Sequence, residues 1–222
     1  IKQNLFYFSH ARTALKYGLQ NLNLKDGECI LIPEYICDVV LHPLENLGIK
    51  FKFYPINDDF APKWDILEGM INDRVKGLLM VHYFGQPQEI EKFQSFCNKH
   101  GLFLIEDNAH GYGGRYKGSK LGTFGDFGIS SPRKILKIHS GGVLWLKENK
   151  LDNDISLIPY SPSIISYLNV FMDNNYPSLK VFFKKLLKNR PDYEDYKLFR
   201  EDKINDYMID FSSKRILRKV NL

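Results

Sequence analysis

Cysteine is scarce in this chain, and the pattern of the few that occur excludes several classes of protein. Cys29, Cys37 and Cys97 are widely spaced and form no CxxC pair, so the sequence indicates neither a disulfide framework nor a zinc knuckle. No apolar run approaches the roughly 20 residues that a membrane-spanning helix needs, and the first residues show no signal-peptide pattern. We therefore expect a protein of a reducing compartment, the cytoplasm, with no membrane span.

Long runs of one charge are absent as well. The net charge is only +5, and acidic residues are dispersed among the basic ones, so we predict no nucleic-acid surface. The basic stretch at 184–190 is more typical of a solvated helix face. The phosphate loops GxGxxG and GxxxxGK[ST] do not occur, which excludes the standard dinucleotide and nucleoside-triphosphate motifs.

The chain does contain ample material for a folded core. Its 222 residues are 44% hydrophobic and 14% aromatic. Between residues 11 and 142, short apolar runs alternate with helical patterns, which is typical of an α/β sheet with crossover helices. The predicted strands are 29–32, 50–54, 76–82, 102–106, 126–130 and 143–146, and the predicted helices are 11–22, 35–47, 64–71 and 88–100.

The pattern changes after Leu146. Residues 147–158 form a boundary region, and helical periodicity follows at 178–189 and 202–220, the latter with one apolar face. We predict a large cofactor-binding domain over residues 1–150 and a mainly helical extension over residues 151–222.

Two residues of the first part could hold a cofactor. Lys134 lies between turns at 130–132 and 140–142, where a backbone can fold closely around a ligand. Asp107 follows the apolar run 102–106, and ligands of open α/β sheets gather at the carboxyl ends of strands. An amine nucleophile and a carboxylate that pairs with a protonated ring nitrogen are what pyridoxal phosphate requires of a protein. If the two residues meet in space, the sequence predicts that cofactor.

Each candidate also has a more ordinary interpretation. Asp107 could equally cap the N-terminus of a helix, and most lysines lie on the surface. Lys137 is a second candidate for the amine, three residues after Lys134. A metal site made by Glu106, Asp107 and His110 is disfavoured, because adjacent residues of a strand point to opposite faces. We predict no metal.

Two segments could contact a phosphate group. The run 9–15 opens the first helix, whose N-terminus presents free amide donors and the positive end of the helix dipole. Its serine and threonine could equally be helix caps. Ser130 and Ser131 could donate their hydroxyl groups to a phosphate, or only satisfy a turn.

Taken together, these motifs resemble the DegT/DnrJ/StrS family of pyridoxal-phosphate-dependent sugar aminotransferases, which have fold type I, like aspartate aminotransferase. The similarity runs in one order from about residue 8 to 146. It rests on LIEDNAHG at 104–111, YKGSKLGTFGD at 116–126, Lys134, and Gly141 with Gly142, and extends to 12–15, 26–33 and 82–87. It implies an α/β, transferase-like large domain with a mostly parallel sheet flanked by helices, and a small C-terminal domain that is largely missing from this sequence.

The resemblance also implies a catalytic role for three residues. Asp107 would pair with the pyridinium nitrogen of the cofactor. His110 would lie near the ring and its phenolic oxygen. Lys134 would form the covalent link to pyridoxal phosphate and, once released by substrate, would transfer the proton between substrate and cofactor.

Cofactor binding would involve further positions. By the same resemblance, the phosphate would be bound by Arg12, Thr13, and Ser130 or Ser131. Either Tyr35 or Cys37 would stack on the ring, and we favour Tyr35 because an aromatic face suits the cofactor.

The activity that the resemblance implies is transfer of an amino group from an amino acid such as glutamate to a nucleotide-linked keto sugar, for surface polysaccharide, glycan or antibiotic sugar biosynthesis. It also implies a homodimer. A sugar dehydratase is disfavoured, because histidine replaces Lys134 in those relatives. A truncated, non-catalytic binding or scaffold subunit remains the alternative from another class, since most of the small domain is missing.

Overall fold

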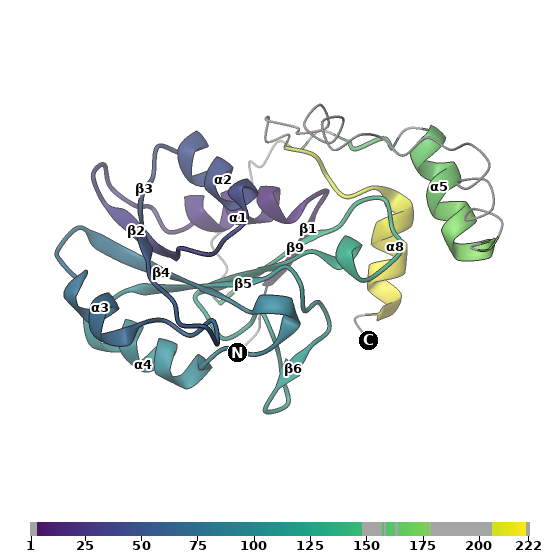
Figure 1. The fold of residues 1–222 in the computed structure, drawn as a ribbon. Helices are drawn as coiled ribbons and strands as arrows, with labels where there is room; N and C mark the ends of the chain where they lie inside the picture. The colour runs from purple at the N-terminus through teal and green to yellow at the C-terminus, as the bar shows by residue number, and fades with distance from the viewer. Residues whose placement is uncertain are drawn as a thin grey trace, which may run out of the picture.

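The fold is built around one sheet of seven strands, seen in the computed structural model of Figure 1, which describes residues 4–147, 157, 159–162, 164–176, 178 and 206–220. The strand order is β1-β9-β8-β5-β4-β2-β3. The strands are β1 (Asn4–Phe8), β2 (Cys29–Pro33), β3 (Lys50–Tyr54), β4 (Val75–Val81), β5 (Phe103–Asn108), β8 (Phe127–Ser130) and β9 (Gly142–Leu146).

The sheet is mostly parallel, as predicted. β3, β2, β4, β5 and β8 pair in parallel, whereas β9 runs antiparallel to both β8 and β1. Every strand predicted from the sequence is present, with ends that differ by at most two residues. The edge strand β1 was not predicted, nor was the short hairpin of β6 (Arg115–Tyr116) and β7 (Ser119–Lys120).

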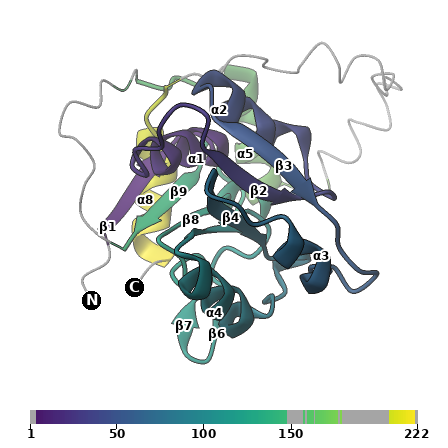
Figure 2. The ribbon, with the colours of Figure 1, turned by 90° about the vertical axis from the view of Figure 1, so that its left-hand side faces the viewer.

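Helices cover both faces of the sheet (Figure 2). On one face α1 (Ala11–Gln20) and α2 (Leu41–Asn46) pack over residues such as Ile105 and Ile129, and on the other α3 (Trp64–Gly69) and α4 (Ile90–His100) pack over Leu78 and Leu104. Because side chains of a strand alternate between its faces, neighbouring residues of β5 enter different cores. This alternation decides which acidic residue of β5 faces the site.

The predicted helix at 35–47 is wrong in its first half. A 3₁₀ turn covers Asp38–Val40, and α2 begins only at Leu41. The backbone before it does not become helical because other partners bind it: the N–H of Glu34 donates to the carbonyl of Tyr54 at 2.9 Å, and the hydroxyl of Tyr83 donates to the carbonyl of Tyr35 at 2.7 Å. Tertiary hydrogen bonds therefore override the local helical pattern.

The C-terminal part contributes α5 (Ile164–Asn175), which was not predicted, and α8 (Phe211–Val220). The predicted helix 202–220 begins later, at Phe211, because the chain before it is extended: the N–H of Ser9 donates to the carbonyl of Tyr207 at 3.0 Å, and Met208 forms a bridge to Phe8. The predicted helix 178–189 lies, apart from its first residue, outside the described residues. None of the described helices is long and apolar enough to cross a membrane.

Candidate active site

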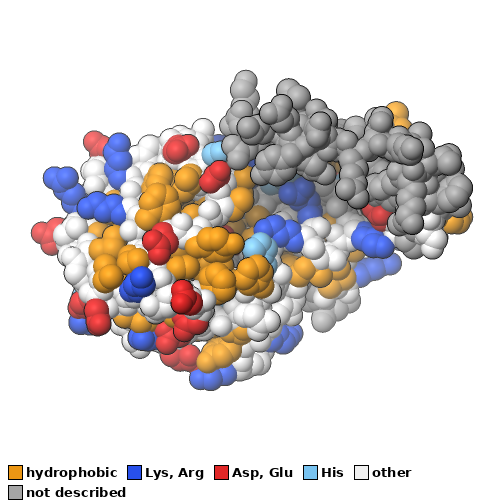
Figure 3. Space-filling model, in the orientation of Figure 1, with side chains coloured by type: hydrophobic (Ala, Val, Ile, Leu, Met, Phe, Trp, Pro, Cys, Tyr) orange, Lys and Arg blue, Asp and Glu red, His pale blue; other side chains and the backbone are white. Residues whose placement is uncertain are grey.

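The loops that follow five of the strands meet at one end of the sheet. β1, β2, β4, β5 and β8 point in the same direction, so the segments that follow them lie side by side at their carboxyl ends, where ligands of open α/β sheets bind. They enclose a cavity of about 360 Å³, within the size range of small-molecule sites. Its wall includes His10, Arg12, Tyr35, Cys37, His82, Tyr83, Phe84, Asp107, His110, Ser131, Arg133 and Lys134. Hydrophobic and basic side chains meet near the centre of the face shown in Figure 3, beside a histidine.

Asp107 lies on this wall near the end of β5, and it does not cap a helix. Its side chain is only 5% exposed and accepts a hydrogen bond from the backbone N–H of Ala109 at 2.8 Å, in a turn that no helix follows. Burial raises the pKa of Asp107 above its ordinary value, and the Ala109 N–H and the charge of Lys134 oppose this effect. A buried carboxylate on a cavity wall is therefore available to a cationic ligand.

Lys134 reaches the same cavity from the neighbouring strand. It ends the 3₁₀ turn Pro132–Lys134 after β8, and its side chain is exposed. The rival, Lys137, is not on the cavity wall, because its ammonium group donates to the carbonyl of Asp173 on α5 at 2.5 Å. The structure thus brings together Asp107 and Lys134, the two residues on which the cofactor prediction depends.

A positively charged corner adjoins α1. The pKa of His10 is lowered from 6.5 to about 3, first by burial and then by the positive charges of Arg133 and Arg12. The N-terminus of α1 adds its dipole, and no side chain caps it. Sequence reasoning assigned no role to His10 or Arg133; the only available signal was that each adjoins a predicted site residue. The corner suits an anionic group.

The predicted phosphate-binding residues differ in their access to this corner. Arg12 and Ser131 line the cavity, whereas Thr13 and Ser130 are fully buried and do not line it. The hydroxyl of Ser130 has no hydrogen-bond partner within the described ranges.

The start of β9 lies very close to the start of α1. A side chain at Gly142 would place its Cβ 2.0 Å from the carbonyl oxygen of His10, so only glycine allows β9 to begin here. This close contact joins the start of α1 to the loop that follows Lys134.

Aromatic rings form another part of the cavity wall. Tyr35 is 58% exposed, and its ring lies 5.8 Å from that of Phe60 and 5.9 Å from that of Tyr83. Phe84 stacks on His110 with ring centroids 6.1 Å apart, and its backbone has a φ of 54°, which is strained for a bulky residue. Both Tyr35 and Cys37 line the cavity, so the preference between them stays a prediction.

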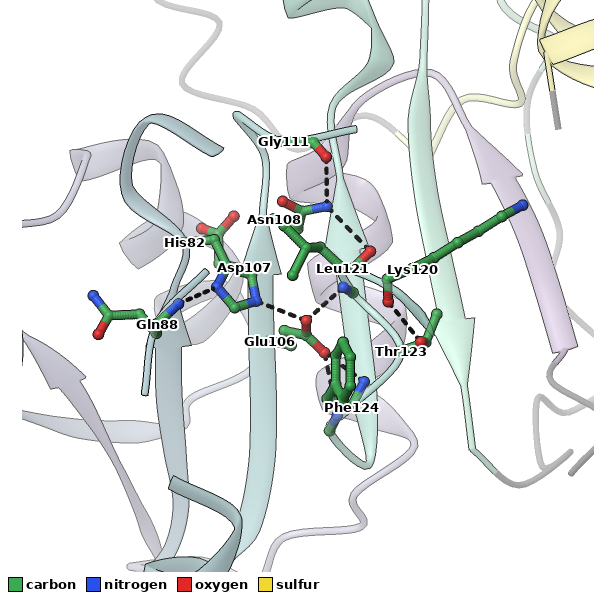
Figure 4. A network of polar contacts seen from close by, with 12 residues as sticks. His82, Gln88, Glu106, Asp107, Asn108, Gly111, Lys120, Leu121, Thr123 and Phe124 are labelled. Atoms are coloured by element: carbon green, nitrogen blue, oxygen red, sulfur yellow. Dashed lines mark hydrogen bonds and ion pairs between the residues drawn. The ribbon is translucent and has the colours of Figure 1, made fainter. Parts of the chain in front are cut away.

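On the other face of β5, the carboxylate of Glu106 has several hydrogen-bond partners within the protein (Figure 4). Glu106 accepts hydrogen bonds from the backbone N–H groups of Gly122, Phe124 and Gly125, at 2.5, 2.7 and 3.2 Å. Nε2 of His82 lies 2.7 Å from the same carboxylate, and its Nδ1 accepts the N–H of Gln88, so Nε2 carries the proton and donates it to Glu106.

Solved structures share this fold. PseC, the Helicobacter pylori aminotransferase involved in pseudoaminic acid biosynthesis, matches 85% of this chain and 59% of its own at a TM-score of 0.63 and 21% identity. An aminotransferase from Psychrobacter cryohalolentis matches 66% of this chain and 38% of its own at a TM-score of 0.60 and 24% identity. The molecule therefore shares the α/β fold of these aminotransferases.

The sequence then identifies the family. A profile of the DegT/DnrJ/EryC1/StrS aminotransferase family matches residues 4–162, and the chain belongs to that family. GDP-perosamine synthase from Vibrio cholerae is 29% identical over 119 residues, which are 53% of this chain and 32% of that protein. A dTDP-sugar 4-aminotransferase, named for dTDP-4-dehydro-2,3,6-trideoxy-D-glucose, from Saccharopolyspora spinosa is 26% identical over 161 residues, 71% of this chain and 42% of that protein. The chain thus spans less than half the length of these curated relatives.

Proposed function

We propose that this chain binds pyridoxal phosphate and takes part in the transfer of an amino group from an amino acid such as glutamate to a nucleotide-linked keto sugar. The observation that carries the proposal is that Asp107 and Lys134 line one cavity whose corner is positively charged. These groups fit the cofactor: a buried carboxylate for the ring nitrogen, an amine for its aldehyde, and basic residues for its phosphate.

Asp107 would hold a proton on the ring nitrogen. When bound, pyridoxal phosphate supplies an electron sink for the carbanion left after proton removal from the amino donor. Burial makes an isolated charge at Asp107 costly, and a cationic ring nitrogen beside it would stabilise that charge. His110, exposed on the same wall, would contact the ring from the side of Phe84.

Lys134 would act as nucleophile and then move the proton. It lies on a short turn at the wall of the cavity that Asp107 also lines, so the two residues would hold the cofactor together. The neutral amine is the form that attacks the aldehyde and that later removes a proton from the substrate carbon.

The phosphate would occupy the corner made by α1 and the residues before Lys134. Arg12 and Ser131 line it, and Thr13 and Ser130 are the predicted ligands behind them. We add Arg133 as a source of positive charge, because that charge lowers the pKa of His10.

The covalent link is the first test. The protein, incubated with pyridoxal phosphate and treated with borohydride, should carry the cofactor mass on the peptide that contains Lys134. Lys134→Ala should lose both this mass and the visible absorbance of the linked cofactor, whereas the matched variant Lys137→Ala should keep both. Cofactor mass on Lys137 instead would contradict the assignment.

The alternative from another class is a non-catalytic binding or scaffold subunit. Stopped-flow absorbance with glutamate separates the two functions. A catalytic chain should convert its bound cofactor and lose the visible band, while a binding subunit should keep it. A dehydratase is the weaker candidate, since Lys134 is present.

We also propose residues 1–150 as the cofactor-binding domain, residues 151–222 as its mainly helical extension, and a homodimer as the working form. Sedimentation velocity of the loaded protein tests the last point, with a single monomeric boundary at micromolar concentration as the contrary result.

A further inference from the structure

One C-terminal segment, residues 206–213, contacts both α1 with the residue before it and the loop that follows Lys134. The carbonyl of Tyr207 accepts the N–H of Ser9, the residue that precedes the cavity-lining start of α1. Asp206 accepts two hydrogen bonds of 2.9 Å from the ammonium group of Lys16, further along α1. The segment is therefore fixed to α1 before it reaches residues 139–140, in the loop that follows Lys134.

Asp210 connects this segment to that loop. The side chain is 4% exposed, and its Oδ1 accepts the N–H of Ser213 at 2.9 Å, which caps the N-terminus of α8. Its Oδ2 accepts the hydroxyl of Ser140 at 2.5 Å, and the hydroxyl oxygen of Ser140 in turn accepts the N–H of Asp210 at 3.0 Å. One buried carboxylate thus binds α8 on one side and the loop on the other.

Ser213 completes the connection. Its hydroxyl oxygen accepts the backbone N–H groups of His139 and Ser140, at 3.2 and 3.3 Å. Since Asp210 binds the N–H of Ser213, it also fixes the position of that hydroxyl. The next residue, Gly141, donates its N–H to the carbonyl of Ser9 at 2.6 Å.

The helix that carries these groups is firmly packed. Leu217 of α8 is fully buried and Ile209 is 6% exposed, in one apolar cluster with Val143 and Trp145 of β9. Figure 1 shows α8 beside the β1 and β9 end of the sheet. A rigid support of this kind can hold a loop in one position.

We propose that Asp210 is a positioning residue for Lys134. It holds residues 139–140 against α8, and through them it holds the short connection that leads back to Lys134. The inference rests on the proposed role of Lys134 as the amine that captures the cofactor. Because attack by an amine depends steeply on its distance and direction, a looser loop should slow capture more than it weakens binding.

The capture rate tests this inference. Pyridoxal phosphate is mixed with the full chain, and the visible absorbance is followed by stopped flow, with borohydride reduction of Lys134 as the end point. Asp210→Asn, which keeps the side-chain volume but removes the charge that accepts the Ser140 hydroxyl, should slow capture by about tenfold. Its dissociation constant for pyridoxal phosphate in a Lys134→Ala background should change by less than about twofold.

Asp206→Asn is the matched control. It removes the ion pair with Lys16, which lies on α1 and not in the loop after Lys134, so its capture rate should stay near that of the wild type. Ser140→Ala should reproduce the effect of Asp210→Asn, and the double variant should be no slower than either single variant. The inference is overturned if Asp210→Asn captures the cofactor at the wild-type rate. It is also overturned if Asp206→Asn slows capture as much as Asp210→Asn does.

Amide hydrogen exchange tests the same contact without any cofactor. In Asp210→Asn, the amides of His139 and Ser140 should exchange about tenfold faster than in the wild type, and those of β5 should not change. If the wild-type chain captures no cofactor, the proposed function fails. Amide hydrogen exchange then tests by itself whether Asp210 holds residues 139–140 in place. Unchanged exchange at His139 and Ser140 then contradicts the inference.

Discussion

Glu106 and Asp107 are adjacent acidic residues of one strand, both buried, with opposite surroundings. Glu106 faces α4 and is bound by three backbone N–H groups and by His82. Asp107 faces the cavity, and the N–H of Ala109 is its hydrogen-bond donor among the described residues. The first carboxylate is saturated by the protein, whereas the second is left for a ligand.

This difference shows how stability and function can be separated within two residues. A buried charge with several donors holds its surroundings together, because removing it strands those donors. A buried charge that has few donors raises the free energy of the protein until a cation pairs with it, and functional sites are where such groups persist. Three substitutions measure the contrast.

Removing the carboxylate of Glu106 should have the largest effect on stability. Glu106→Ala should lower the free energy of unfolding by about 4 kcal/mol, because His82 and the N–H groups of 122–125 lose their acceptor. Urea denaturation measures it. A loss below about 1 kcal/mol would show that water or a rearranged loop replaces Glu106, and the contrast would fail.

The second largest effect on stability should come from lowering the pH, because His10 lies in the charged corner of the cavity. The folded pKa of His10, about 3, lies below its ordinary value of 6.5, so its contribution to stability is present above 6.5 and is lost as pH falls toward 3. At pH 5 the wild type should have lost about 2 kcal/mol that His10→Asn retains. Denaturation of both proteins at pH 7 and pH 5 measures the difference.

Phosphate sharpens this second prediction. An anion near Arg12 and Arg133 screens the charges that help to lower the pKa of His10, so the acid-induced loss should shrink when inorganic phosphate is present. Chloride at equal ionic strength is the control. An equal response to both salts would argue against a specific anion site.

The unsaturated carboxylate should matter least for stability. Asp107→Asn should change the free energy of unfolding by less than about 1 kcal/mol at neutral pH, yet weaken pyridoxal phosphate binding at least about tenfold. Equilibrium denaturation and absorbance titration measure the two quantities. A large loss of stability would show that Asp107, like Glu106, stabilises the fold, and the contrast between the two residues would fail.

The pH dependence of this variant has a defined sign. Burial raises the folded pKa of Asp107 above 3.8, so its contribution to stability is full below 3.8 and is lost as pH rises through the folded pKa. The wild type should therefore lose stability relative to Asp107→Asn as pH rises from acid. The opposite slope would mean that partners, not burial, dominate at this carboxyl group.

Much of the sheet was predictable because its signals are local. Apolar runs such as 102–106 form strands wherever both faces are covered, and Asp107 after such a run was expected at a carboxyl end. Strand β1 and the non-helical chain at Glu34 and Tyr35 depend on partners far away in sequence, β9 for the one and Tyr54 with Tyr83 for the other. Local patterns do not carry that information.

The sequence by itself determined the alternation of strands and helices, and it placed Asp107 and Lys134 in the order typical of the family. Only the tertiary structure decided that the two share a cavity, that Lys137 turns toward α5, and that Asp210 binds Ser140 across 70 positions of the chain. The reason is physical. Periodicity reports which face of an element is buried, whereas the distance between two side chains depends on how all the elements pack.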